Sequence, residues 1–508
     1  MNVSNSIFLQ ALPGQVISHK IQQGAIDIKL STQCFAYLFS QVIYNLYFHP
    51  LRNYSGPFWA RASLLWRIVH SMDGQFHRHL ENCHKRYGDV FRVSPNELSF
   101  CSPGAWTEIY TPSHKGVAKI LKNEFYDVFG AGFEIQSIGT ERDAVLAHQK
   151  RALFSAALSA RGLAQQEPII QKNLDLFVQK LGRLGSTAHG IDMAKWFIYV
   201  GFDILGEMAF GDSFGCVERE ASHPWLDLML GLMHMITVMD NLRRFPWLFQ
   251  LSQYFLSNWA GGFRDQMIQY SKDKTAARLE KEGEENDFLA NVVDKVRQGK
   301  ISQAEMEAHS WNMAMAGGET TGSAMASILY FILKSSEVHR KLNDEVRSAY
   351  TNFGDITIAS TTKLVYLMAT LKEGMRIFPT APQGTPRVSP GVTVAGHYVP
   401  EGTEFYVSPW AVSHDDRFWN EPYAFKPERW IDPDCKDVKE ASQPFSLGPR
   451  VCPGKIFAYG QMALQLAKMI YMYDMELVDQ ELDWMNACKM HFLWWKPELN
   501  VRFRPCKA

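Results

Sequence analysis

The chain has 508 residues, of which 46% are hydrophobic and 13% aromatic, so it can bury a large apolar core. Its 52 basic and 53 acidic side chains almost cancel, which argues against a nucleic-acid-binding protein. The 8 cysteines show no close pairing, which argues against a disulfide framework and favours a reduced, cytosol-facing compartment.

The first 48 residues are predicted to form an N-terminal membrane-associated segment, followed by a single globular domain over residues 49–508. Residues 34–48 are rich in aromatic and aliphatic side chains, but this run is shorter than the roughly 20 residues that a spanning helix needs. Such a run suits a membrane interface, where it either lies flat or spans with help from its flanks. The alternative is a helix packed on the domain itself.

Helical periodicity dominates the chain between residues 64 and 378. Helices are predicted over 64–87, from 141, and over 165–185, 190–210, 223–239, 247–280, 302–334 and 364–378. Strands are predicted as a hairpin over 90–94 and 97–100, and then over 392–394, 404–407 and within 476–503. The stretches 115–140 and 281–287 are predicted loops, so the chain is expected to be mainly α with a small β region.

Two groups of charged residues stand out on the predicted helices. The helix that begins near residue 141 carries His148, Lys150 and Arg151, and a solvated helix face is the favoured interpretation of such a cluster by sequence alone. Glu373 and Arg376 are three residues apart, so they share a helix face. At this spacing a surface ion pair is the usual explanation, and it contributes little stability.

The helix over 302–334 contains a polar notch, Gly317-Gly318-Glu319-Thr320, within an apolar run. Each glycine would weaken an ordinary helix by roughly 1 kcal/mol relative to alanine, so a functional reason is expected. Missing side chains would let the helix pass close to a flat cofactor, and Glu319 and Thr320 would then pass protons to oxygen held beside it. The alternative is that the glycines serve helix packing and the threonine is bonded internally.

The stretch 444–460 places Cys452 between two glycines and directly before a new helical pattern. A cysteine near a helix N-terminus is expected to have a lowered pKa and to be present as thiolate. Gly448 and Gly454 allow the close approach of a flat group, and Arg450 suits a carboxylate. Together these features suggest an axial cysteine ligand to haem. Zinc is disfavoured because no second Cys or His stands at ligand spacing nearby.

The pattern Phe445, Gly448, Arg450, Cys452 and Gly454 resembles the haem-ligand signature of the cytochrome P450 family. The stretch 316–321, AGGETT, is similar to the oxygen-activation helix of that family. The resemblance covers the chain from residue 49 to its end and implies a cytochrome P450 fold, with 49–508 as the haem-thiolate domain. The HPL…GP and PNELSF stretches most closely resemble fungal microsomal members that tailor secondary metabolites.

The resemblance also implies a structural role for the charged pair on the helix over 364–378. In the family, the residues that match Glu373 and Arg376 are buried and bonded to a third residue, which here is Arg429. These three side chains would pin the segment that carries the cysteine loop. Removing one of them would leave a buried charge without its partner.

Further residues are assigned to haem and substrate by the same resemblance. Arg387 and Arg450 match positions that contact haem propionates. His148 and Arg151 are the best matches to another propionate-binding pair, although their spacing is one residue shorter than the family's. Residues 491–495 would insert a loop into the substrate pocket; otherwise they form a sheet edge.

The implied reaction is insertion of one oxygen atom from O2 into a C–H bond, or epoxidation, of a hydrophobic small molecule such as a polyketide or terpenoid. Two electrons from NADPH would arrive through a flavin reductase, and Glu319 and Thr320 would deliver protons. The implied location is the endoplasmic reticulum membrane, with the catalytic domain facing the cytosol. Two rivals stay open: an O2-independent thiolate-haem isomerase or dehydratase, and a non-catalytic haem-binding protein.

Overall fold

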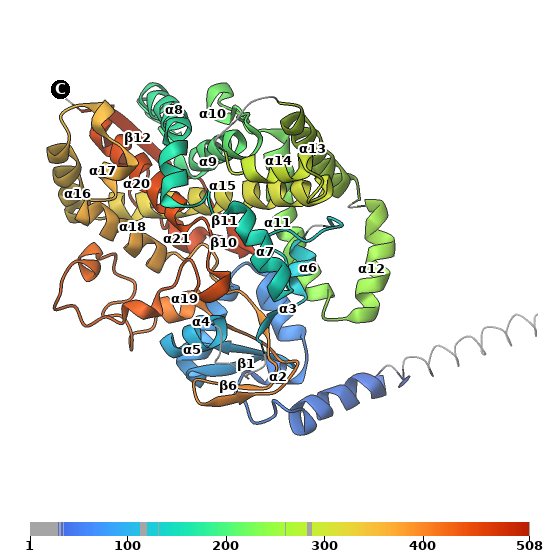
Figure 1. Cartoon of the computed structure of the whole chain (residues 1–508). Coiled ribbons are helices and arrows are strands. Elements are labelled where there is room, and N and C mark those ends of the chain that lie inside the picture. The colour runs from blue at the N-terminus through green and yellow to red at the C-terminus, as the bar shows by residue number, and fades with distance from the viewer. Residues whose placement is uncertain are drawn as a thin grey trace, which may run out of the picture.

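Helix α15 (Gln303–Lys334) is the longest described helix, and it runs through the middle of the helical part of the molecule (Figure 1). The computed structural model describes residues 29, 32–33, 35–111, 119–130, 132–259, 261–281 and 287–506. The Ser302 side chain accepts a hydrogen bond from the Glu305 N–H at 3.1 Å, which satisfies one of the unpaired donors of the first turn. The helix therefore begins where the sequence predicts it.

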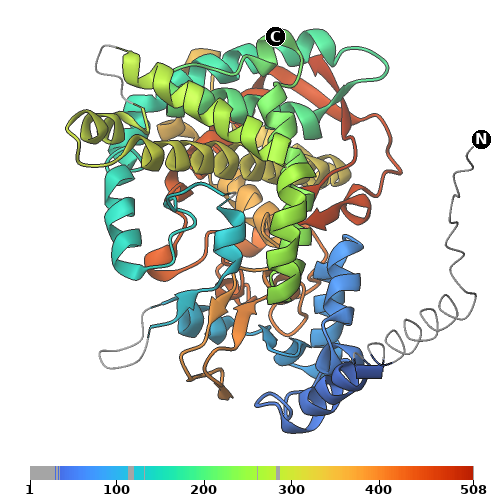
Figure 2. The same cartoon turned by 90° about the vertical axis from the view of Figure 1, so that its right-hand side faces the viewer.

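The described chain is mainly helical, as the sequence predicts, and the β-rich part lies at one end with α2, α4 and α5 (Figures 1 and 2). The other α-helices are α2 (Phe58–Ala62), α3 (Leu65–Met72), α4 (Phe76–Tyr87), α5 (Pro103–Tyr110), α6 (Phe125–Phe129), α7 (Ala144–Phe154), α8 (Ala160–Leu184), α9 (Met193–Phe210), α10 (Cys216–Arg219), α11 (Pro224–Leu242), α12 (Pro246–Trp259), α13 (Gly261–Glu280), α14 (Ala290–Arg297), α16 (Ser336–Ala349), α17 (Ile358–Thr361), α18 (Val365–Ile377), α19 (Pro409–Ser413), α20 (Lys455–Met472) and α21 (Trp484–Ala487). A π-helix, η1 (Tyr44–Phe48), and the 3₁₀-helices η2 (Phe353–Asp355), η3 (Pro427–Trp430), η4 (Lys439–Ala441) and η5 (Gly448–Arg450) complete the set of described helices.

The described strands form small sheets, the largest of which has the order β1-β2-β8-β5-β3. Within it only β2 and β8 are parallel. The predicted hairpin over 90–94 and 97–100 is confirmed with these bounds. The strands are β1 (Val90–Ser94), β2 (Glu97–Phe100), β3 (Leu121–Lys122), β4 (Ile191–Asp192), β5 (Arg387–Val388), β6 (Val392–Val394), β7 (His397–Val399), β8 (Glu404–Val407), β9 (Tyr473–Leu477), β10 (Lys489–His491), β11 (Leu493–Trp495) and β12 (Asn500–Pro505).

Three predicted segments differ in the structure. The helix predicted over 64–87 is divided into α3 and α4, because Gly74 turns the chain at φ +79° and a Cβ there would lie 2.8 Å from Lys489 Cβ. The helix predicted over 247–280 is likewise divided into α12 and α13. The loop predicted over 115–140 contains β3 and α6 in its described part. Residues 112–118 and 282–286 lie outside the described residues, and with them most of the predicted acidic loop.

The described part of the N-terminal segment is helical up to Phe48. Its aromatic side chains face solvent, and Tyr47 and Phe48 are each 66% exposed. Among the described residues, no helix is both long and apolar enough to cross a bilayer. Residues 1–28 lie outside the described residues, so the predicted membrane-associated segment is seen only in part.

Gly317 and Gly318 lie where α15 packs against α9. A Cβ on Gly317 would lie 2.6 Å from Leu205 Cδ1, and a Cβ on Gly318 would lie 2.6 Å from Phe202 Cδ2. The approach is mutual, because a Cβ on Gly201 would lie 2.9 Å from Gly318 O. The two glycines therefore serve helix packing, and the expectation that they make room for a flat cofactor is wrong.

A buried network, which we call the meander network, ties α18 to the segment that leads to the cysteine loop. Glu373 and Arg376 are fully buried and form a bidentate ion pair with two N–O distances of 2.8 Å. Arg429 Nε lies 3.2 Å from Glu373 Oε1, as the resemblance implies, and Arg429 also pairs with Asp437, which no motif indicated. Two positive and two negative side chains thus compensate one another.

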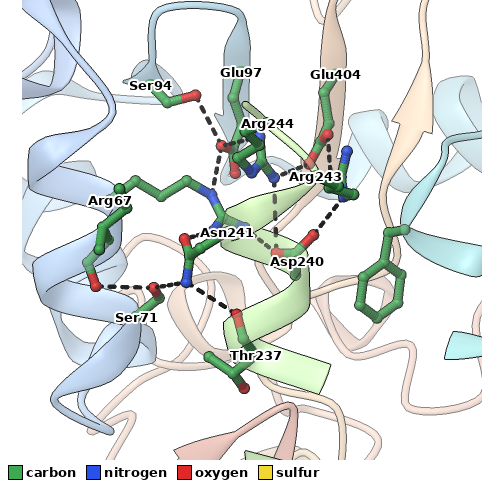
Figure 3. Close-up of polar contacts among 12 residues, drawn as sticks. Arg67, Ser71, Ser94, Glu97, Thr237, Asp240, Asn241, Arg243, Arg244 and Glu404 are labelled. Atoms are coloured by element: carbon green, nitrogen blue, oxygen red, sulfur yellow. Dashed lines mark hydrogen bonds and ion pairs between the residues drawn. The ribbon is translucent and has the colours of Figure 1, made fainter. Parts of the chain in front are cut away.

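A second buried network, the sheet network, joins α3 and the end of α11 to the five-stranded sheet (Figure 3). Arg67 Nε lies 2.8 Å from Glu97 Oε2, and Arg67 Nη2 lies 2.6 Å from Asp240 Oδ2. Burial alone would raise the pKa of Glu404, but Arg244 and Arg243 hold it at about 2. The members are three arginines and three carboxylates: Arg67, Arg243, Arg244, Glu97, Asp240 and Glu404.

We expect Arg376→Met to lower the free energy of unfolding by about 3–5 kcal/mol, because the substitution leaves Glu373 buried without its bidentate partner. Arg340→Met is the matched control, since it breaks an exposed pair with Asp344 and is expected to cost less than about 1 kcal/mol. Urea unfolding followed by circular dichroism measures both losses. Equal losses in the two variants would contradict the stabilising role of the meander network.

Candidate functional site

The cysteine loop, residues 445–454, leads directly into α20, so Cys452 lies just before a helix N-terminus as predicted. The loop closes on itself, because the Cys452 N–H donates to Phe445 O at 2.8 Å. Gly448 has φ +70°, and a Cβ there would lie 2.0 Å from Tyr110 O, so only glycine fits. Gly454 has φ −82°, and a Cβ there would contact Cys452 Sγ at 3.9 Å. Gly448 is therefore required by the turn, whereas a side chain at position 454 would make only ordinary contact with the sulfur.

The Cys452 side chain is exposed on one side, although protein atoms crowd the sulfur elsewhere. Burial by these atoms is the largest influence and raises the pKa of the thiol above its ordinary value, while the Gly454 N–H, Arg151 and Lys455 act to lower it. The expected lowering of this pKa is therefore wrong for the polypeptide by itself. A metal ion that binds the sulfur would deprotonate it.

Three cations lie close together: Lys122 and Arg387 beside the cysteine loop, and Arg450 within it. Strand β3 pairs with β5 so that Lys122 stands opposite Arg387, and both residues are buried. Like charges directly opposite one another destabilise a sheet. Burial, and then the charges of Arg387 and Arg450, hold the pKa of Lys122 well below its ordinary value. Glu141, an acid near enough to act on this pKa, pairs with Lys150 at 3.0 Å.

The hydrogen bonds of these cations go to uncharged acceptors. Arg450 donates to Glu141 O at 3.0 Å, Arg387 donates to Tyr126 Oη at 3.1 Å, and Lys122 donates to Gly139 O at 2.5 Å. Within the described part of the chain, none of the three forms an ion pair with a carboxylate. Two buried cations and the half-buried Arg450, all without a described carboxylate partner, suit an anionic ligand. Lys122 was missed at the sequence level because it belongs to no motif.

His148, Lys150 and Arg151 of the basic cluster on α7 lie in three different environments. The expectation that the cluster forms a solvated helix face is therefore wrong for Lys150 and Arg151. Arg151 Nη1 donates to Val451 O at 2.8 Å and so reaches the cysteine loop. Lys150 is buried against Glu141. His148 is exposed and makes no hydrogen bond or ion pair with a described residue.

Helix α15 has one uncovered position in its buried middle. Ala316 is exposed, whereas Met315 and Gly318 on either side of it are buried. One turn further on, the half-buried Thr320 donates its hydroxyl hydrogen to Ala316 O at 2.5 Å. The threonine is thus bonded back to the helix, as the sequence suggested, and its hydroxyl lies at the open side.

Glu319 forms an ion pair with a residue outside α15, unlike Thr320, which bonds back to the helix. Its side chain is buried and pairs with Lys496, whose Nζ lies 2.6 Å from Glu319 Oε1. The Ser323 hydroxyl donates to the same carboxylate oxygen at 2.6 Å. Lys496 comes from the C-terminal hairpin, more than a hundred residues away in sequence, so no local pattern could have indicated the pair.

Aromatic rings form an apolar wall around the tip of the β10–β11 hairpin. Phe492 occupies the turn with φ +68°, and its ring centroid lies 4.9 Å from that of Phe129 and 5.4 Å from that of Phe125. Phe129 and Phe133 also contact Trp311 on α15, with centroid distances of 6.0 and 5.6 Å. The turn at Phe492 therefore lies against α6, while the residues on either side of it are paired strands.

The residues around Cys452 fit a haem. An uncovered cysteine sulfur is a donor that haem iron accepts, and cations without acidic partners suit the two carboxylates of a porphyrin. The arrangement lacks the second and third donors that a zinc site needs, among the described residues near the sulfur.

Comparison with known proteins agrees with this geometry. The family model described as cytochrome P450 matches residues 54–503. The chain is 42% identical to cytochrome P450 monooxygenase ORF9 of Penicillium roqueforti over 93% of either chain. It is also 42% identical to cytochrome P450 monooxygenase BOT4 of Botryotinia fuckeliana, over 91% of this chain and 88% of that one. Identity to cytochrome P450 monooxygenase astJ of Aspergillus oryzae is 35%, over 92% and 94%. The chain therefore belongs to the cytochrome P450 family, as a haem-dependent monooxygenase.

Proposed function

We propose that Cys452 is the axial haem ligand and that the enzyme inserts one oxygen atom from O2 into a C–H bond, or a double bond, of a hydrophobic molecule. The observation that carries the proposal is the uncovered Cys452 sulfur beside cations that have no described carboxylate partner. The turn at Gly448 and the hydrogen bond from the Cys452 N–H to Phe445 O hold the loop that presents the sulfur, and Gly454 follows it at the start of α20.

The cations are proposed to hold the haem carboxylates. Arg387 and Arg450 take this role by resemblance, and the structure supports adding Lys122, since it is buried opposite Arg387. The Arg151 side chain stabilises the cysteine loop by its hydrogen bond to the backbone carbonyl of Val451. His148 is the remaining candidate on α7 for binding a haem carboxylate. When bound, the haem supplies the electron-rich iron that activates O2, with two electrons from NADPH through a flavin reductase.

Glu319 and Thr320 are proposed to deliver protons to the oxygen. The Thr320 hydroxyl lies at the open side of α15 beside Ala316, and Glu319 precedes it in the same turn. This acid–alcohol pair favours O2 chemistry over an isomerase or dehydratase, which needs no protons from such a pair. It also favours catalysis over a merely haem-binding protein.

The substrate is proposed to be an apolar skeleton, such as a polyketide or terpenoid of fungal secondary metabolism. Support comes from the aromatic wall of Phe125, Phe129 and Phe492 beside α15. Phenylalanine rings offer apolar contact area and no hydrogen-bonding groups, so they suit an apolar ligand. The relatives at 42% identity are fungal monooxygenases by name, which agrees with this proposal.

We also propose that the chain associates with the endoplasmic reticulum membrane through its N-terminal segment, with the catalytic domain in the cytosol. The support is an exposed aromatic surface that continues from the N-terminal helix into α2. It includes Tyr44, Tyr47, Phe48, Phe58 and Trp59, which are 47–66% exposed. Aromatic side chains of this kind favour the interface between lipid and water.

We expect an apolar product to carry one oxygen atom from isotopically labelled O2 when the holoenzyme, a flavin reductase and NADPH are incubated with polyketide and terpenoid skeletons. Thr320→Val is expected to slow product formation by about 100-fold, because proton delivery fails. Thr362→Val is the control, since this hydroxyl makes the same bond to a carbonyl four residues back on an exposed surface. Mass spectrometry measures the label. A rearranged product formed without O2 would instead identify an isomerase.

The membrane proposal predicts that the full chain floats with phosphatidylcholine vesicles in a density gradient. Replacing Tyr47 and Phe48 by serine is expected to weaken vesicle binding by about tenfold or more, because each ring buries apolar area worth roughly 1.5–3 kcal/mol. Val365→Ser removes an equally exposed apolar side chain from α18 and should leave flotation unchanged. Unaltered flotation of the double variant would exclude this surface.

A further inference from the structure

The Glu319–Lys496 ion pair is buried, and its hydrogen bonds reach only one of the two carboxylate oxygens. The two side chains are 3% and 5% exposed. Lys496 Nζ and the Ser323 hydroxyl both donate to Oε1, each at 2.6 Å, and Lys496 also donates to the Ser323 oxygen at 2.7 Å. Oε2 is buried and accepts no hydrogen bond from any described residue.

Glu319 also lines a cavity of about 390 Å³ that leads outward between α9, α11 and the β10–β11 hairpin. Lys195 and His234, which are exposed, lie in its wall, as do Asp192 and the buried His491. Each water molecule occupies about 30 Å³ in the liquid, so a space of this size, with these polar groups set in a mainly apolar lining, is large enough for several. The cavity therefore connects the outside of the molecule to the buried acid.

Lys496 is itself held rigidly. Its Nζ donates a third hydrogen bond to Trp494 O at 3.2 Å, and Trp494 Nε1 donates to Pro379 O at 2.8 Å. Three residues further on, the Leu499 N–H donates to Asp192 Oδ1 at 3.0 Å. The ammonium group thus stays fixed relative to α15, and so does the carboxylate oxygen that it binds.

We propose that Lys496 is a positioning residue that holds Glu319 Oε1 and so leaves Oε2 as the oxygen that takes protons from the cavity. This inference rests on the proposed role of Glu319 as proton donor. Oε2 gains a proton from water in the cavity and gives it up on the Thr320 side, so that Glu319 returns to the carboxylate after each transfer. Only protons move in this step, and the ammonium group of Lys496 keeps its own.

A purely structural role is the competing explanation, because the pair also ties the C-terminal hairpin to α15. Lys468 offers a matched control: it is buried on α20 and paired with Asp175, away from the cavity. Lys496→Met and Lys468→Met each remove one buried ammonium group, and only the first is expected to disturb proton supply.

The test needs no known substrate. Holoenzyme with a flavin reductase oxidises NADPH and reduces O2, and we expect Lys496→Met to slow this oxidation by about tenfold and to raise its solvent isotope effect in heavy water. Lys496→Arg, which keeps the charge, should stay within about twofold of wild type, and Lys468→Met should leave both values unchanged. Glu319→Gln combined with Lys496→Met should be no slower than either single variant, since the two residues act as a unit.

Urea unfolding gives a readout that does not depend on turnover. The unfolding free energies of wild type, the two single variants and the double variant form a double-mutant cycle. If residues 319 and 496 are coupled, the double variant should lose less stability than the sum of the two single losses. If Lys496→Met fails to fold, Lys496→Gln replaces it in each measurement. Equal rates and isotope effects in the Lys496 and Lys468 variants would overturn the inference. Wild-type holoenzyme that oxidises no NADPH would instead contradict the proposed function.

Discussion

Buried charge is the constraint on which this structure depends. Moving a charged side chain out of water costs several kcal/mol, and a fold that does so must bring a partner to it. The meander network and the sheet network meet this demand with equal numbers of arginines and carboxylates. In doing so they bind together segments that lie far apart in the sequence, including α18 with the segment before the cysteine loop, and α11 with the five-stranded sheet.

Three of the cations that depart from this balance lie together beside the cysteine loop. Lys122 and Arg387 stand opposite each other in paired strands, with Arg450 beside them, and no carboxylate among the described residues neutralises them. A haem brings two carboxylates of its own, so the group that Cys452 would bind would offset most of the positive charge that the polypeptide leaves unpaired here. The same reasoning separates Glu319, whose partner is Lys496, from the networks that serve stability alone, because its second oxygen has no partner among the residues that the structure describes.

Local patterns predicted the parts of the molecule that depend on local structure. The hairpin of β1 and β2, the start of α15 at Ser302 and the position of Cys452 before α20 all follow from turn, capping and periodicity rules. Gly317 and Gly318 were placed correctly in a helix, but sequence could not say which face they occupy, and that face is packed on α9. Lys122 and Lys496 carry no motif, since their partners are set by strand pairing and by the return of the C-terminal hairpin.

Ligation of the haem by the Cys452 thiolate can be seen in the spectrum of the reduced protein with carbon monoxide. We expect a strongly red-shifted Soret band in wild type, its loss in Cys452→Ser, and its retention in Cys435→Ser, which changes a half-buried cysteine of the preceding segment. A normal haem–carbon monoxide band in folded wild-type protein would show that Cys452 is not the ligand.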